Sequence, residues 1–301
     1  MTMIETFTVA LGNGIELSCR GAGSSGDPVL VFLHGFPEAA FVWDDLLAHF
    51  SKRYRCVAPN LRGYERSSAP ADVEAYRAKH LIGDISSLID ALGGELAALV
   101  AHDWGGALAW GLAAQRPEAI GRLVIVNSPH PATFLRELRH NPQQQAASAY
   151  MNFLCRPDAE ALLSANDFAR LWPFFTNMGA ADPKHVGGGW LTEATRERYR
   201  EVWRQGLRGG CNYYRASPLR PPLGDNDAVM RVELPAAAVT SHAPTLVVWA
   251  ENDIALPVAL LDGLEEFVPD LRIVRVPGAT HWIIHERPAL VIAEIERALG
   301  G

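Results

Sequence analysis

ELAALVAHDWGGALAWGLAAQ, residues 95–115, joins a continuous apolar run to a segment whose apolar residues have helical spacing. The run predicts a buried parallel strand at 95–103, and residues 104–115 predict a helix. Asp103 lies at the junction, with small residues two positions before and after it. Small residues there allow a strand to turn sharply into a helix, which lifts the central side chain above the carboxyl edge of the sheet. Asp103 is therefore a candidate nucleophile, although Asp is also favoured as an ordinary helix N-cap.

The same alternation of strand and helix recurs on both sides of this stretch. Further apolar, β-rich runs predict strands at residues 28–34, 54–59, 122–127, 243–253 and 271–278. Apolar residues three and four apart predict helices at residues 79–92 and 288–299. This alternation is typical of an α/β protein with a mostly parallel, doubly wound sheet.

Residues 131–240 interrupt the alternation. They are rich in Trp, Phe, Arg and Pro, and they predict helices joined by loops with no convincing strand. An ordinary run of core helices would give the same pattern. Because the segment lies between two strand-bearing parts of the chain, we expect a helical cap inserted into a core formed by residues 1–130 and 241–301.

The composition argues against several classes of partner. With 34 acidic and 27 basic residues, the net charge of −7 gives no electrostatic footprint for nucleic acid or an anionic membrane. The four cysteines lack the spacing of a metal site or a disulfide framework and predict small buried apolar residues in a reducing cytoplasm. The first ten residues, MTMIETFTVA, resemble no signal peptide, and no apolar run is long enough for a membrane helix. No metal or cofactor is predicted, and a homodimer stays open.

The turn HGFPE, residues 34–38, follows a predicted strand and can aim a backbone N–H at the cleft beside Asp103. Phe36 is the candidate donor, and the N–H of Trp104, directly after the nucleophile, is the second. Together they would form an oxyanion hole. The other reading of HGFPE is a simple loop between a strand and a helix.

Two further residues complete a candidate triad. Asp253 ends the predicted strand run at 243–253, in the loop ENDIALP, and His281 follows the next strand. The chain order nucleophile, acid, base is that of a hydrolase built on such a sheet. His285 is the main competitor for the base, but it lies further from the strand end. Asn127 cannot be the acid, because an amide carries no charge that would stabilise an imidazolium.

An Asp nucleophile points to a saturated electrophilic carbon. A serine would leave an ether there, which activated water cannot hydrolyse, whereas a carboxylate leaves an ester with an attackable carbonyl. Alkyl halides and epoxides are the two obvious substrate classes. An epoxide opens to an alkoxide, which needs a positioned acid, and tyrosine suits this role. The cap should then contain functional tyrosines.

Four motifs resemble those of the soluble epoxide hydrolases, a family of the α/β-hydrolase fold. They are HGFPE at 34–38, AHDWGG at 101–106, NSPHP at 127–131 and CNYYRA at 211–216. The resemblance covers essentially the whole chain. It implies hydrolysis of an epoxide to a vicinal diol, with the epoxide and water as the small-molecule partners.

In that family two cap tyrosines hold the epoxide oxygen, and the matching residues are Tyr150 and Tyr214. Tyr213 is the alternative, but the family's tyrosine directly precedes Arg, which favours Tyr214. The resemblance also implies a cis bond between Phe36 and Pro37. The expected pocket residues are His34, Phe36, Pro37, Trp104 and Phe153.

One motif departs from the family, and three other functions compete. RGYERS, residues 62–67, carries Glu65 where the family has Gly, so we expect a local loop change without effect on the chemistry.

A haloalkane dehalogenase would share Asp103 and Trp104, but its second halide donor, an Asn, is replaced by Phe36. A fluoroacetate dehalogenase would carry carboxylate-binding arginines after the nucleophile, but the equivalent stretch of this chain, WGGALAW, contains none. A non-catalytic hydrolase-fold receptor would typically lack a triad member.

Overall fold

The computed structural model describes residues 3–224 and 227–300. The first two residues and the last residue of the expected core, and residues 225–226 of the expected cap, lie outside the described residues. The strands are β1 (Glu5–Ala10), β2 (Glu16–Ala22), β3 (Val29–Leu33), β4 (Arg55–Pro59), β5 (Ala98–His102), β6 (Leu123–Val126), β7 (Thr245–Ala250) and β8 (Leu271–Val276).

The α-helices are α1 (Asp44–Phe50), α2 (Ala78–Leu92), α3 (Asp103–Gln115), α4 (Pro131–His140), α5 (Pro142–Ala147), α6 (Tyr150–Leu154), α7 (Ala159–Phe168), α8 (Trp172–Thr176), α9 (Glu193–Arg204), α10 (Arg208–Ala216), α11 (Ala236–Val239), α12 (Ile283–Glu286) and α13 (Pro288–Ala298). Short 3₁₀ helices are η1 (Ala40–Trp43), η2 (Val73–Tyr76), η3 (Pro117–Ala119), η4 (Ala228–Arg231), η5 (Val258–Leu261) and η6 (Leu264–Glu266).

The eight strands form one sheet in the order β1-β2-β4-β3-β5-β6-β7-β8. From β4 to β8 all neighbours are parallel, whereas β1 and β2 pair antiparallel at one edge. The doubly wound α/β fold is therefore confirmed. Neither β1 nor β2 was predicted from the sequence: β1 is an edge strand whose residues are exposed or half-buried, and neither strand has a continuous apolar run.

The central strands are mostly apolar, and buried throughout, because helices cover both faces of the sheet. Every residue of β3, β5, β6 and β7 is buried. Helix α1 packs against α13, and α2 packs against α3. The cysteines are free, and Cys155 corrects the expectation of four buried side chains, since it is only half-buried where Arg220 donates to its sulfur.

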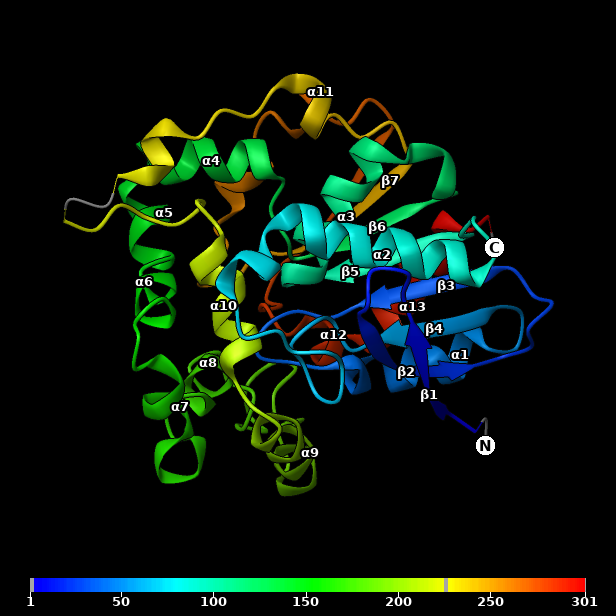
Figure 1. Cartoon of the computed structure of the whole chain (residues 1–301), viewed down its shortest axis with the longest axis horizontal. Helices are drawn as coiled ribbons and strands as arrows, with labels where there is room; N and C mark the ends of the chain where they lie inside the picture. Colours follow the sequence, from blue (N-terminus) through cyan, green and yellow to red (C-terminus); the bar gives the residue numbers. More distant parts are fainter. Residues whose placement is uncertain (1–2, 225–226, 301) are drawn as a thin grey trace.

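Within the described residues, the segment between β6 and β7 contains helices and loops but no strand. In Figure 1, α5, α6, α7 and α8 lie to one side of the sheet, and α10 lies between them and the sheet. We propose that residues 131–240 form the expected cap. Helix α11, near the end of this range, packs against α3 of the core.

The parallel strands bring their carboxyl ends to one edge of the sheet. Val100 pairs with Val124, and Val126 pairs with Val248, so the ends of β5, β6 and β7 are in register. Loops that follow adjacent strands at such an edge form a common cleft. The candidate nucleophile, acid and base follow β5, β7 and β8 at this edge.

Candidate active site

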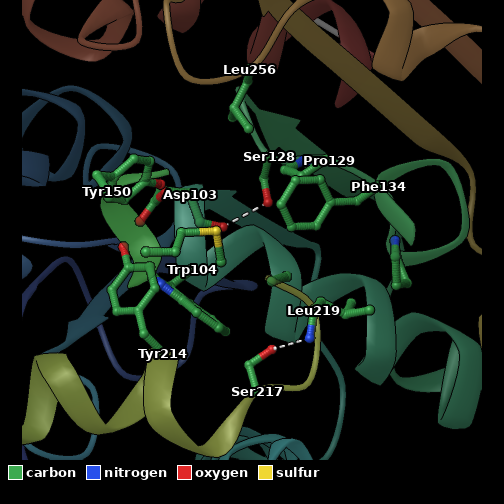
Figure 2. Close-up of a pocket in the computed structure, with 13 residues that line it drawn as sticks. Asp103, Trp104, Ser128, Pro129, Phe134, Tyr150, Tyr214, Ser217, Leu219 and Leu256 are labelled. Atoms are coloured by element: carbon green, nitrogen blue, oxygen red, sulfur yellow. Dashed lines mark hydrogen bonds between the residues drawn. The ribbon is translucent and has the colours of Figure 1, made fainter. Parts of the chain in front are cut away.

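Asp103 lies on a sharp turn between β5 and α3. Its φ of +49° is in the left-handed region, which is strained for any residue except glycine. A Cβ on Gly105 would lie 2.6 Å from the carbonyl oxygen of Leu33, so only glycine allows the helix to approach β3 so closely. Ser128 donates a 2.6 Å hydrogen bond to the backbone carbonyl of Asp103 (Figure 2). These contacts hold the Asp103 side chain at the carboxyl edge of the sheet.

The two carboxylate oxygens of Asp103 have different surroundings. Oδ1 accepts a 2.7 Å hydrogen bond from the backbone N–H of Phe36. Oδ2 lies 3.7 Å from Nε2 of His281. Trp104, the second expected donor, is in the first turn of α3, where backbone N–H groups have no partner within the helix. Oδ1 is thus held by the HGFPE turn, while Oδ2 faces the imidazole.

His281 and Asp253 form a short, buried contact. Nδ1 of His281 lies 2.6 Å from Oδ2 of Asp253, and both side chains are buried. Burial disfavours the imidazolium, but the negative charges of Asp253 and Asp103 outweigh this effect and raise the pKa of His281 to about 9. Burial also opposes ionisation of Asp253. The charge of His281 and hydrogen bonds, including one from the Ala255 N–H, nevertheless keep the pKa of Asp253 below its ordinary value.

His285, the competing base, contacts Glu38 and Trp190 instead of Asp103. Its Nε2 lies 2.8 Å from Oε1 of Glu38, and its ring stacks on Trp190 with centroids 4.1 Å apart. The geometry therefore favours His281 as the partner of Asp103.

Three residues that the sequence analysis did not assign to the site support it. Asn127, with a φ of +38°, donates from Nδ2 to Asp253 at 2.9 Å and accepts the N–H of Ala250 at 2.8 Å. His102 donates from Nε2 to the backbone carbonyl of His281 at 2.9 Å. Glu38 is fully buried and lies 3.3 Å from Nδ1 of His102. Two features of the sequence could have indicated these residues: Asn127 is a polar residue at the end of β6, and Glu38 is the charged residue of HGFPE.

Tyr150 and Tyr214 come together beside Asp103 from α6 and α10 (Figure 2). The rings of Tyr150 and Tyr214 pack edge-on with centroids 6.0 Å apart, and Trp104 packs edge-on against Tyr214 with centroids 5.2 Å apart. Burial, followed by nearby negative charge, raises the pKa of both tyrosines, so both hydroxyls keep their protons at neutral pH. Tyr213 instead donates to the backbone carbonyl of Arg62, which removes it as the alternative.

Two cavities meet at Asp103, Tyr150 and Tyr214. The larger has a volume of about 410 Å³ and the smaller about 80 Å³. The larger is lined by Phe36, Asp103, Ala146, Ala147, Tyr150, Pro173, Phe174, Asn177, Met178, Tyr214, Ile254, Ala255, His281 and Trp282. The smaller is lined by Asp103, Trp104, Ala107, Ser128, Pro129, Pro131, Phe134, Tyr150, Met151, Tyr214, Ser217, Leu219 and Leu256 (Figure 2). Apart from Asp103 and His281, these walls carry no charged side chain.

The expected pocket residues are placed in two groups. Phe36 lines the larger cavity and Trp104 the smaller. His34, Pro37 and Phe153 are not among the described residues that line either cavity, so their part in the pocket stays a prediction.

Each of the three has contacts that explain its absence. His34 is fully buried within the turn, where its Nε2 accepts the N–H of Leu61. The carbonyl of Pro37 accepts a hydrogen bond from Trp203, and its bond to Phe36 is cis, as the resemblance implied. Phe153 lies under the guanidinium of Arg170, 6.0 Å from its ring centroid.

Glu65, which stands where the family has glycine, has a φ of +51°. It therefore adopts the left-handed conformation that glycine would adopt without strain. Its Oε2 accepts hydrogen bonds from Ser18 Oγ at 2.7 Å and from the Arg66 N–H at 2.7 Å. Its carboxylate thus satisfies polar groups of the loop away from Asp103.

Comparison with known proteins places this geometry in a family. The family model for the α/β-hydrolase fold matches residues 28–288. Mouse epoxide hydrolase 4 is 34% identical over 283 residues, which are 93% of this chain and 75% of that protein. A crystal structure of a Bacillus megaterium epoxide hydrolase with an inhibitor superposes with a TM-score of 0.88 at 30% identity, covering 98% of this chain and 100% of the other. The chain belongs to the epoxide hydrolase family of the α/β-hydrolase fold.

Membership in this family makes the protein a hydrolase. A further relative, the AB hydrolase superfamily protein YfhM of Bacillus subtilis, is 33% identical over 93% of this chain and 92% of its own length. Among the described residues of this hydrolase, no helix is long and apolar enough to span a membrane.

Proposed function

We propose that this hydrolase converts epoxides to vicinal diols through a covalent ester on Asp103. The observation that carries the proposal is that one cavity is lined by the Asp103 carboxylate, by Tyr150 and Tyr214, and by the imidazole of His281. The relatives named above as epoxide hydrolases support this substrate class.

In the first half-reaction, Oδ2 of Asp103 attacks an epoxide carbon. The C–O bond of the ring breaks, and a proton from Tyr150 or Tyr214 goes to the leaving oxygen, which becomes the first hydroxyl of the diol. Oδ1 then becomes the carbonyl oxygen of the ester, because it already accepts the hydrogen bond of Phe36. The tyrosinate recovers its proton from solvent.

In the second half-reaction, His281 takes a proton from water, whose oxygen attacks the ester carbonyl. Asp253 orients the imidazole and stabilises its charge. The backbone N–H groups of Phe36 and Trp104 stabilise the oxyanion that forms on Oδ1. The ester bond then breaks, and the imidazolium of His281 returns its proton to the departing alkoxide, which becomes the second hydroxyl of the diol. The Asp103 carboxyl group releases its proton to solvent, which balances the proton taken up by the tyrosinate and regenerates the carboxylate.

The cavity walls support a substrate that is uncharged and largely apolar. Aromatic and aliphatic side chains such as Phe174, Met178, Phe134 and Leu219 surround the reacting groups. A charged substituent would lose its hydration there without gaining a partner. We therefore propose aryl or alkyl epoxides as the substrates.

His281→Gln tests the covalent mechanism, because ring opening does not need the base. Incubation with styrene oxide should increase the intact mass of this variant by one epoxide, and peptide mapping should place the increase on Asp103. Asp103→Asn, which lacks the nucleophile, is the control and should gain no mass.

A single turnover of wild-type enzyme in heavy-oxygen water gives an independent test. The label should enter the Asp103 carboxylate and not the diol, because water attacks the ester carbonyl. Label in the diol during the first turnover would mean that water attacks the epoxide directly. Asp103 would then be a general base, and the covalent mechanism would be wrong.

A further inference from the structure

The HGFPE turn is held on two sides. On the side of the core, Oδ1 of Asp103 accepts the N–H of Phe36 at 2.7 Å. On the other side, the segment 37–38 contacts α9, a helix of the proposed cap that lies more than 150 residues further along the chain. The backbone that presents the Phe36 N–H is therefore shared between the core and the cap.

Two side chains of α9 make this second contact. The indole Nε1–H of Trp203 donates to the carbonyl oxygen of Pro37 at 2.7 Å, and the hydroxyl of Tyr199 donates to Oε1 of Glu38 at 2.7 Å. Both side chains are almost completely buried, with exposed fractions of 3% and 0%. They are four residues apart and so lie on one face of the helix. Both hydrogen bonds are shielded from water, where the loss of a partner is costly.

The contact continues beyond the turn. The guanidinium of Arg198 lies 4.3 Å from the ring centroid of Phe41 and 2.5 Å from Oδ2 of Asp44. The ring of Phe41 also packs edge-on against Tyr199, with centroids 4.9 Å apart. Helix α9 thus contacts the segment 37–44 at residues 37, 38, 41 and 44, and movement of the helix would displace the turn with it.

We propose that Trp203 and Tyr199 are positioning residues for the oxyanion hole, and that docking of helix α9 thereby sets the rate of ester hydrolysis. The inference rests on the proposed covalent function. An oxyanion donor is effective only when it is held close to its productive geometry, which depends on the residues that support it. Here part of that support comes from the cap.

This role predicts unequal effects on the two half-reactions. In the free enzyme the Phe36 N–H stabilises the Asp103 carboxylate, so a looser turn leaves the nucleophile no less reactive. In ester hydrolysis the same N–H stabilises charge that develops on Oδ1, so a looser turn slows the step. A loss of folded protein would instead reduce both steps equally.

Trp203→Phe removes the donor to Pro37 and keeps an aromatic ring in the cluster. Trp172→Phe is the matched control, because the Trp172 ring packs at a tilt against Trp203 with centroids 4.7 Å apart but donates to the carbonyl of Asp167, away from the turn. Tyr199→Phe removes the other donor without loss of the ring. Rapid-quench mass spectrometry with styrene oxide measures the formation and the decay of the ester in each variant.

In Trp203→Phe we expect ester decay to slow by about tenfold and ester formation to change by less than about twofold. Tyr199→Phe should shift the ratio of the two rate constants in the same direction, and it carries the test if Trp203→Phe does not fold. Trp172→Phe should keep the wild-type ratio even if its melting temperature falls.

The inference is overturned if Trp203→Phe and Tyr199→Phe both keep the wild-type ratio, or if Trp172→Phe changes it equally. Absence of any ester in wild-type enzyme and in His281→Gln would instead refute the proposed function. The two failures are therefore distinguishable.

Discussion

Nε2 of His281 lies 3.7 Å from Oδ2 of Asp103, further than a hydrogen bond allows. The base therefore does not tie up the oxygen that attacks carbon, yet it lies beside the ester that this oxygen would form. Nδ1 of the same ring is held by Asp253 at 2.6 Å, which fixes its orientation. The arrangement suits two consecutive steps in which Asp103 and His281 act in turn.

The pH dependence of the two steps should differ. Burial disfavours the charged imidazole, but Asp253 and Asp103 raise the pKa of His281 to about 9 in the free enzyme. Ester formation removes the charge of Asp103, so the pKa of His281 should fall below this value in the intermediate. Hydrolysis needs the neutral imidazole, so its rate constant should rise with pH until that pKa is passed.

Rapid-quench measurements from about pH 6 to about pH 9 would separate the two steps. Ring opening needs the Asp103 carboxylate and not a neutral imidazole, so it should lack the rise seen in hydrolysis. Both rate constants come from the same quench series, which controls for effects of pH on folding. The same rise in both steps would mean that the imidazole also acts in ring opening.

The two cap tyrosines should share the acid role. Tyr150→Phe and Tyr214→Phe should each slow ring opening by roughly 10 to 100-fold, and the double variant should nearly abolish it. Because each single variant keeps one donor, the effects should not be additive.

Tyr213→Phe is the control, since its hydroxyl donates to the Arg62 carbonyl. It should leave ring opening unchanged if the protein stays folded. Wild-type turnover in the double variant Tyr150→Phe, Tyr214→Phe would remove both residues from the mechanism.

Asn127 should act on hydrolysis through Asp253. Asn127→Gly removes the amide that donates to Oδ2 of Asp253 but tolerates the φ of +38°. We expect ester decay to slow by about tenfold, as for other residues that orient a catalytic partner, and ester formation to be unchanged. Asn127→Ala adds backbone strain, so an effect common to both variants reports on the lost amide. Unchanged decay in both would exclude this positioning role.

The sequence predicted the parts of the fold that depend on local pattern. Buried strands such as β5 show as apolar runs, and the turn at Asp103 shows as small residues around a polar one. The edge strand β1 could not be found this way, because its residues alternate only weakly between half-buried and exposed. The expected strand 95–103 was also too long, since it ends at His102 and helix α3 begins at Asp103.

The supporting residues of the site depend on contacts between distant segments. Asn127 meets Asp253 from 126 residues away, and His102 meets the carbonyl of His281 from 179 residues away. No spacing within either motif encodes such a contact. The contact of Trp203 with the HGFPE turn is of the same kind, and only the packing of α9 reveals it.

Haloalkanes should be poor substrates, although Asp103 could attack them. A halide leaves as an anion and needs donors that can cradle it, but the side chain of Phe36, which lines the larger cavity, cannot donate a hydrogen bond. Trp104 and the two cap tyrosines could still donate, but no Asn completes a halide cradle. Bromide release from 1-bromohexane should therefore be near background while styrene oxide is hydrolysed.

Phe36→Asn would supply a side-chain donor and should raise bromide release relative to epoxide turnover, whereas Phe36→Leu should not. Bromide release by the wild-type enzyme as fast as epoxide hydrolysis would mean that the protein acts as a haloalkane dehalogenase.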